Sequence, residues 1–450
     1  MFTHNNYSDS LSDSRHAMLT RMRRSLESPH MLWIIVGLGI ALRTIWAIRR
    51  PAAAIGEAAN VALALADGRG FADAYHVGQG PTAHILPTQP LLAGGVYALL
   101  GPHSVSAEAV LFALATIFTV GSYLLLWRGF SRLGTPRWAR NLALAYVCLF
   151  SPYLADEVVS FRVWDGGLAG LLAAIMLNLL VDLDHDPAAA SSRRYRLLAL
   201  VGAITFFVQP LIGIACYVAT VVLAVRRLGL MSSGSFALTS VASLAILLVP
   251  WTMRNALVMG TPILLRSNAG LELSISMYPG ALRPGPNPKE TFNSRLREVH
   301  PLQSAQAYQR MKQAGGEVRY ATMLGDQAQA WMRAHPADVI RLAFRHLRET
   351  YVPPTWITHL ENERFVLVRT LLVDTAGILG LFGIALALIW RRQCWIYPAV
   401  ITLLPGLMFA LFQPIPRYDY LFFGLLTFAA ADLVASIVDR QMTRRRPITG

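Results

Sequence analysis

Charged residues are scarce in this sequence of 450 residues. They make up only 15% of the chain, whereas 54% of its residues are hydrophobic. A soluble domain carries roughly 25% charged residues. The apolar residues also arrive in blocks long enough to cross a lipid bilayer. This composition excludes an ordinary soluble globular protein and predicts an integral membrane protein.

Cysteine is scarce as well. The three cysteines are Cys148, Cys216 and Cys394, and they form no CxxC or Cys/His spacing. This argues against a disulfide framework and against a cysteine-based zinc site. The sequence also lacks a glycine-rich phosphate-binding loop. We therefore expect no nucleotide cofactor, and we leave open whether a divalent cation is bound.

The positive charge comes almost entirely from arginine. The formal net charge is +14, and Lys289 and Lys312 are the only lysines. Because the arginines form short clusters between apolar blocks, they are typical of topology signals, and we expect no nucleic-acid partner. Residues 1–30 lack the apolar stretch and cleavage site of a signal peptide, so we expect the first apolar block to remain as an anchor.

Ten apolar blocks predict an all-α polytopic membrane protein with about ten transmembrane helices. They lie near residues 31–48, 107–127, 138–152, 164–182, 196–209, 211–225, 236–253, 368–390, 394–412 and 419–438. Three blocks, 138–152, 196–209 and 211–225, are shorter than the roughly 17 residues that a spanning helix needs. The last two are divided by Gln209-Pro210, so a re-entrant hairpin is an alternative there.

The arginine clusters predict which segments face the cytoplasm. Cytoplasmic loops are the basic ones, and placing the N-terminus inside puts nearly every cluster in a short inner loop. These clusters include Arg21, Arg23 and Arg24; Arg128 and Arg132; Arg193 and Arg194; Arg226 and Arg227; Arg391 and Arg392; and Arg444, Arg445 and Arg446. Arg49 and Arg50 are an exception, but they open a long translocated segment, and such segments are largely exempt from the rule.

This topology divides the chain into five parts. We expect a cytoplasmic tail (1–30), a membrane domain (31–253) with a first outer loop (49–106), a small, mainly helical outer domain (254–367), C-terminal transmembrane helices (368–438) and a second cytoplasmic tail (439–450). The arginine-rich loops favour the plasma (inner) membrane of a bacterium, with an outer domain in the periplasm.

The first outer loop contains a strong helix former from Glu57 to Asp67, which Gly68 is expected to end. About eleven residues are too few to span a bilayer, so this helix should lie at the membrane surface, and a second interfacial helix should begin near Thr88. Glu57 lies where the helix dipole favours an anion, and its carboxylate is a candidate base or ligand. The structural alternative is a first-turn residue that only stabilises the helix.

Several stretches of the sequence resemble the C-type membrane glycosyltransferases. In the first loop, an acidic residue follows the first span, and Gly-x-Gly-Phe, Gly-Pro-Thr and Pro-x-x-Pro-Leu-Leu come after it. Later stretches are Val-Trp-Asp-Gly-Gly-Leu at 163–168, Pro-Trp-Thr-Met-Arg-Asn at 250–255, the segment 265–273, and Arg417-Tyr418. The family includes the protein O-mannosyltransferases and the aminoarabinose transferases of lipid A. The similarity covers most of residues 31–438.

The resemblance implies transfer of a sugar from a polyprenyl-phosphate donor to a lipid, glycan or protein acceptor at the outer face of the membrane. Glu57 would be the general base, which suits a hydroxyl nucleophile. The implied substrate-binding residues are His84, Arg254, Asn255, Arg266, Asn268, Arg417 and Tyr418. Arginine suits a phosphate because its guanidinium binds bidentately. Many relatives carry a second acidic residue in the first loop, and here we expect Asp156 or Glu157 of the second outer loop to replace it.

Other interpretations remain. A lone histidine such as His84 is more often structural than a ligand, and an arginine at a membrane edge often only anchors its helix. A polytopic transporter or flippase is one alternative function, although transporters usually consist of pseudo-symmetric halves. A non-catalytic assembly protein of cell-envelope polysaccharide synthesis is the other.

Overall fold

The computed structural model describes residues 21, 23–49, 54–150, 156–186, 192–227, 229–358 and 366–444. Within these ranges nearly all regular structure is helical, and the one isolated β-bridge joins Ala72 to Pro81. The expected all-α fold is confirmed. Residues 1–20 and 445–450 of the two expected tails, and Arg50, lie outside the described residues.

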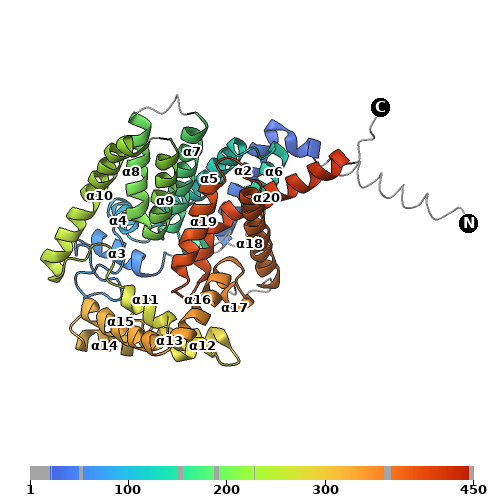
Figure 1. Cartoon of the computed structure of the whole chain (residues 1–450). Coiled ribbons are helices and arrows are strands. Elements are labelled where there is room, and N and C mark those ends of the chain that lie inside the picture. The colour runs from blue at the N-terminus through green and yellow to red at the C-terminus, as the bar shows by residue number, and fades with distance from the viewer. Residues whose placement is uncertain are drawn as a thin grey trace, which may run out of the picture.

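Seven helices of the described chain are long and apolar enough to cross a membrane. They are α2 (Pro29–Arg49), α5 (Val105–Arg132), α7 (Gly166–His185), α9 (Pro210–Arg227), α10 (Gly229–Met259), α18 (Val366–Ile389) and α20 (Pro416–Arg444). The other three expected spans are the shorter helices α6 (Arg137–Leu149), α8 (Ser192–Val208) and α19 (Ile396–Phe409). All ten helices belong to one bundle, which makes the chain a multi-spanning membrane protein (Figure 1).

Helix α6 is one of the shorter helices of the bundle, and a buried arginine binds the carbonyls of its last turn. The final carbonyls of a helix have no partner within the helix. Arg43 of α2 donates to two of them, to Cys148 O at 3.1 Å and to Val147 O at 3.3 Å. Gly39 allows this approach, since a Cβ there would lie 2.8 Å from the Cys148 Cβ. The chain then runs on to the π-helix η1 (Asp156–Ser160).

Helices α8 and α9 form an antiparallel hairpin that turns at Gln209. Tyr217 of α9 bonds to Ala199 O of α8, and a Cβ on Gly213 would lie 2.2 Å from the Phe206 Cα. The break expected at Gln209-Pro210 is therefore present, with a helix on each side of it.

The arginine-rich loops lie together at one end of the bundle. Ion pairs connect Arg128 with Asp182, Arg227 with Asp184, Arg392 with Asp432, and Arg23 with Asp439. The last pair joins the start of the first helix to the end of the last, so the two described ends of the chain lie on the same side. The arginine pattern predicts this arrangement; that this side is the cytoplasmic one remains a prediction.

The segment expected as an outer domain forms a helical layer across one end of the bundle (Figure 1). We call this layer the outer domain; that it faces outward remains a prediction. It contains α11 (Ala269–Ser276), α12 (Pro279–Leu282), α13 (Pro288–Val299), α14 (Ala305–Gln313), α15 (Glu317–Ala334), α16 (Pro336–Tyr351) and α17 (Thr355–Thr358). Its core includes Leu271, Val299 and Tyr320. Helices α11 and α15 cross closely at Gly270, where a Cβ would lie 2.0 Å from Ala321 O.

The two helices expected in the first loop are present as α3 (Glu57–Ala66) and α4 (Thr88–Leu100). That they lie at the membrane surface remains a prediction. They pack against each other at Gly94, where a Cβ would lie 3.2 Å from Ala62 O. Leu91 and Leu99 of α4 remain exposed, as expected for a helix at the membrane interface. The loop between α3 and α4 reaches the outer domain, and this contact builds the site described next.

Candidate active site

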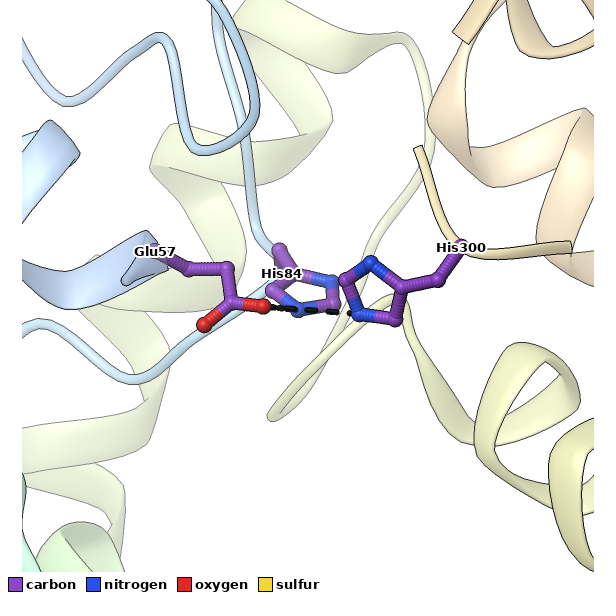
Figure 2. A group of neighbouring side chains, drawn as sticks. All are labelled: Glu57, His84 and His300. Atoms are coloured by element: carbon purple, nitrogen blue, oxygen red, sulfur yellow. Dashed lines mark ion pairs between the residues drawn. The ribbon is translucent and has the colours of Figure 1, made fainter. Parts of the chain in front are cut away.

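Glu57 begins α3 and points its carboxylate at two histidines. Gly56 precedes it with a φ of 97°, a conformation that favours glycine and turns the chain sharply into the helix. Glu57 Oε1 lies 3.4 Å from His300 Nε2 and 3.9 Å from His84 Nε2 (Figure 2). The three residues come from the start of α3, from the loop before α4 and from the turn after α13, so the site lies between the first loop and the outer domain.

His84 is buried, and the hydroxyl of Tyr75 holds its ring. Its Nδ1 lies 2.8 Å from the Tyr75 hydroxyl. Burial lowers the pKa of His84 to about 3, even though Glu57 acts in the opposite direction. The imidazole is therefore neutral at pH 7, and its Nε2 faces the carboxylate of Glu57.

His300 is held through its other ring nitrogen. The Leu302 backbone N–H donates to His300 Nδ1 over 3.2 Å. A neutral ring that accepts at Nδ1 carries its proton on Nε2. In this tautomer the proton lies on the nitrogen that faces Glu57, but the 3.4 Å separation is longer than an ordinary hydrogen bond, so the contact is electrostatic.

One carboxylate oxygen and two imidazole nitrogens also form a candidate metal-binding group. The ligand atoms of Glu57, His84 and His300 all lie within 4.8 Å of one another, and zinc takes this donor set. The Tyr75 contact of His84 suits a ligating histidine, whose second nitrogen is usually hydrogen-bonded. The His300 tautomer does not suit ligation through Nε2. The distances thus fit a cation held by all three groups, whereas the hydrogen bond from Leu302 to His300 Nδ1 fits a cation held by Glu57 and His84.

Glu57 is ionised and is the most exposed of the three groups. Burial acts to raise the pKa of its carboxyl, but Coulombic attraction from His84 and His300 in their protonated forms, and from Arg417, outweighs this effect and leaves the pKa below its usual value. Its side chain is 16% exposed, against 4% for His84 and 8% for His300. A carboxylate in this state can accept a proton from an approaching hydroxyl.

Glu272 of α11 supplies a second carboxyl near Glu57. Burial raises its pKa, the charge of Glu57 adds to this rise, and His300 opposes it. Asn268 donates from Nδ2 to Glu272 Oε1 over 3.2 Å. Neighbouring carboxyls whose pKa values shift in opposite directions are typical of acid–base sites.

The acidic companion expected at Asp156 or Glu157 remains a prediction. Both residues open η1, but their side chains lie outside the part of the chain that is described.

Arg417 and Arg266 lie close enough to act electrostatically on the site. Arg417, in the first turn of α20, lowers the pKa of Glu57, and both guanidiniums act to lower that of His84. Arg266 is also paired with Asp165, with Nη2 2.6 Å from Oδ2. Tyr418, next to Arg417, stacks on Phe409 with ring centroids 4.8 Å apart. The phosphate-binding role of these residues stays a prediction.

The side chains of Arg254 and Asn255 instead donate hydrogen bonds to backbone carbonyls around the site. Arg254 donates to Thr82 O at 2.6 Å and to Phe71 O at 2.5 Å. Asn255 is fully buried and donates to Ile263 O at 2.8 Å. In this structure the pair fixes the first loop and the exit from α10, while phosphate binding by either remains untested.

The sequence reasoning missed His300, Glu272 and Glu317. His300 follows α13 and shows no local signal, because only the fold brings it to a loop more than two hundred residues earlier. Glu317 did carry a signal. It follows Gly316, whose φ is 107°, and starts α15 just as Glu57 follows Gly56 and starts α3.

The comparisons with known proteins give distant likenesses. No family model and no curated protein matches the sequence. Among solved structures, the chain is similar over 93% of its length to archaeal oligosaccharyltransferase AglB from Archaeoglobus fulgidus in complex with an inhibitory peptide and a dolichol-phosphate, with a TM-score of 0.47 and 14% identity. It spans about half of that protein, 52% of its length.

A second similarity is to ArnT from Cupriavidus metallidurans bound to undecaprenyl phosphate. It covers 94% of this chain and 82% of ArnT, with a TM-score of 0.35 and 15% identity. ArnT in the apo state matches over the same shares, with the same TM-score and 18% identity. The chain is thus similar, at a distance, to an oligosaccharyltransferase and to ArnT.

Proposed function

We propose that this protein is a membrane glycosyltransferase that moves a sugar from a polyprenyl-phosphate donor to an acceptor at the outer face of the plasma membrane. The observation that carries the proposal is the Glu57 carboxylate. It is ionised, partly exposed and surrounded by His84, His300 and Arg417 where the first loop meets the outer domain. A carboxylate beside fixed positive charge suits a reaction that takes a proton from a hydroxyl and releases a phosphate.

In the proposed reaction, the acceptor hydroxyl gives its proton to Glu57 and its oxygen forms a bond to the anomeric carbon of the donor sugar. The bond between that carbon and the phosphate oxygen breaks, and polyprenyl phosphate leaves with the electron pair. His300 lies beside the carboxylate, with Nε2 3.4 Å from Oε1. Arg417 and Arg266 stabilise the charge on the leaving phosphate, since guanidinium groups bind phosphate bidentately.

The decisive experiment is an assay of the purified protein with polyprenyl-phosphate sugars and mixed lipid, glycan and peptide acceptors, with product detected by mass spectrometry. We expect transfer by the wild type and none by Glu57→Gln. If the wild type transfers no sugar from any donor but moves a labelled lipid-linked sugar across proteoliposomes, the transporter alternative is correct. A protein that does neither, and whose Glu57→Gln variant still supports envelope synthesis in cells, is the non-catalytic assembly protein.

A further inference from the structure

Four hydrogen-bond donors converge on the carboxylate of Glu317, the first residue of α15. Oε2 accepts from Gln79 Nε2 at 2.8 Å and from Thr82 Oγ1 at 2.6 Å. Oε1 accepts from the Ala83 backbone N–H at 2.8 Å and from Ser267 Oγ at 2.7 Å. Glu317 is 8% exposed, so these bonds replace its contact with water. They connect the outer domain to the first loop and to the segment that follows α10.

These bonds fix His84 by two routes. Thr82 and Ala83 immediately precede His84, and the His84 N–H also donates to Thr82 Oγ1 at 3.1 Å. The second route runs through Gln79, whose Oε1 accepts from the Tyr75 backbone N–H at 2.8 Å, and the Tyr75 hydroxyl lies 2.8 Å from His84 Nδ1. The main chain and the ring of His84 therefore both depend on Glu317.

The same turn of α15 also holds His300. Tyr320, three residues after Glu317, donates from its hydroxyl to Val299 O at 2.9 Å. Val299 ends α13, and His300 follows it directly. The first turn of α15 thus fixes the two segments that carry His84 and His300, the histidines beside Glu57.

We infer that Glu317 is a positioning residue, which sets the placement of His84 beside Glu57 and so keeps the catalytic carboxylate aligned. The inference rests on the proposed function for its kinetic consequence. Glutamine is a sharp probe because its amide has one acceptor oxygen and a donor NH₂. At position 317, two of the four donors would then face a donor instead of an acceptor. A displacement of about 1 Å in a catalytic group can cost roughly 10²-fold in rate.

The test compares Glu317→Gln, His84→Gln and the double variant, with Glu290→Gln as control. Glu290 lies on α13 of the same domain with 56% of its side chain exposed, paired with Arg297. We expect kcat to fall about 10- to 100-fold in Glu317→Gln and to stay at the wild-type level in Glu290→Gln. If Glu317 acts through His84, the double variant should be no slower than His84→Gln alone. If the fold-losses in kcat of the two single variants instead multiply in the double variant, the inference is overturned.

Hydrogen exchange gives a readout that does not require activity. We expect faster amide exchange over residues 79–84 in Glu317→Gln and unchanged exchange in the C-terminal half of α15. Thr82→Val removes one of the four donors and serves as a milder variant, with the same pattern at smaller amplitude, if Glu317→Gln fails to fold. If the wild type proves to transfer no sugar, this exchange pattern still supports the positioning role, whereas unchanged exchange over 79–84 refutes it.

Discussion

Arg266 donates from Nη2 to Oδ2 of Asp165 across 2.6 Å, although 101 positions separate the two residues in the sequence. Asp165 precedes α7, and Arg266 belongs to the segment that leads into the outer domain. The pair joins two of the motifs that suggested the family. It also means that a phosphate approaching Arg266 competes with a carboxylate that is already bound.

Asp165→Asn should therefore bind polyprenyl phosphate more tightly than the wild type. An ion pair of this kind is worth about 0.2–1 kcal/mol, so we expect about a 1.4- to 5-fold lower Kd. The measurement is equilibrium binding of undecaprenyl phosphate in detergent, with Asp67→Asn, a partly exposed carboxylate of the first loop, as control. Weaker binding by Asp165→Asn would show that Asp165 orients Arg266 for the phosphate instead of competing for it.

Glu57→Gln should keep the fold and lose sugar transfer. The substitution preserves size and removes the charge, and general-base assistance is worth about 10²–10⁴ in rate. The loss of the helix-dipole interaction should cost only about 0.3–1 kcal/mol of stability. The assay is kcat for transfer, with Tm in detergent as the check on folding. Transfer at the parental rate would leave Glu57 as a helix-start residue and make Glu272 the next carboxyl to test.

The buried His346 of α16 predicts a loss of stability in acid. Burial lowers the pKa of His346 to about 4, whereas an unfolded histidine titrates near pH 6.5. Between these values the unfolded chain binds a proton that the folded chain excludes, so stability falls as the pH drops from about 6.5 to 4. The slope is at most about 1.4 kcal/mol per pH unit.

The measurement is Tm in detergent from pH 7.5 to pH 4, for the wild type and for His346→Gln. We expect the Tm of the wild type to fall more steeply with decreasing pH than the Tm of His346→Gln. Burial raises the pKa of the nearby Glu349, which has the opposite effect on stability, but it is present in both proteins and cancels in the comparison. Parallel curves would contradict the prediction. His335→Gln, at an exposed histidine, is the control.

Gly377→Ala should destabilise the contact between α18 and α16. A Cβ at Gly377 would lie 1.9 Å from Tyr351 O, so the backbone of one helix must move. Overpacking of this kind typically costs about 1–3 kcal/mol. Gly37→Ala in α2 is the matched control, because a Cβ there has no atom within 4 Å. We expect Gly377→Ala to unfold at a lower Tm than Gly37→Ala. Equal Tm values would contradict the packing argument.

The predicted topology can be tested by cysteine labelling. The three native cysteines are buried, which keeps the background low. A cysteine replacing Gly285 in the exposed turn before α13 should react with an impermeant maleimide in intact spheroplasts. A cysteine replacing Arg193, at the start of α8, should react only after lysis. The opposite pattern would invert the proposed orientation and place the Glu57 site in the cytoplasm.

The membrane helices and the helix starts could be predicted from the sequence because their signals are local. Apolar length located the spans, and the Gly56-Glu57 step located the start of α3. The local signal did not show that the last carbonyls of α6 are bound by Arg43, about a hundred residues earlier. It also did not show that Gln79 and Thr82 bind Glu317, since these hydrogen bonds form only when the loop and the outer domain meet.

The candidate site was predicted only in part for the same reason. Glu57 and His84 lie in one loop and could be singled out together. His300 and Glu272 come from the outer domain, and no spacing in the sequence relates them to Glu57. Arg254 was predicted from its motif, but a motif does not indicate that both terminal nitrogens of its guanidinium donate to Phe71 O and Thr82 O.

The contact between Arg43 and the end of α6 has a consequence for how the chain enters the membrane during synthesis. A guanidinium at the centre of an isolated spanning helix costs about 2.5–3.5 kcal/mol to insert. The carbonyls that bind Arg43 outside its own helix belong to Val147 and Cys148, which the ribosome adds about a hundred residues later. We therefore expect the first segment to insert more favourably once α6 has been made, because the two helices then satisfy each other's polar groups.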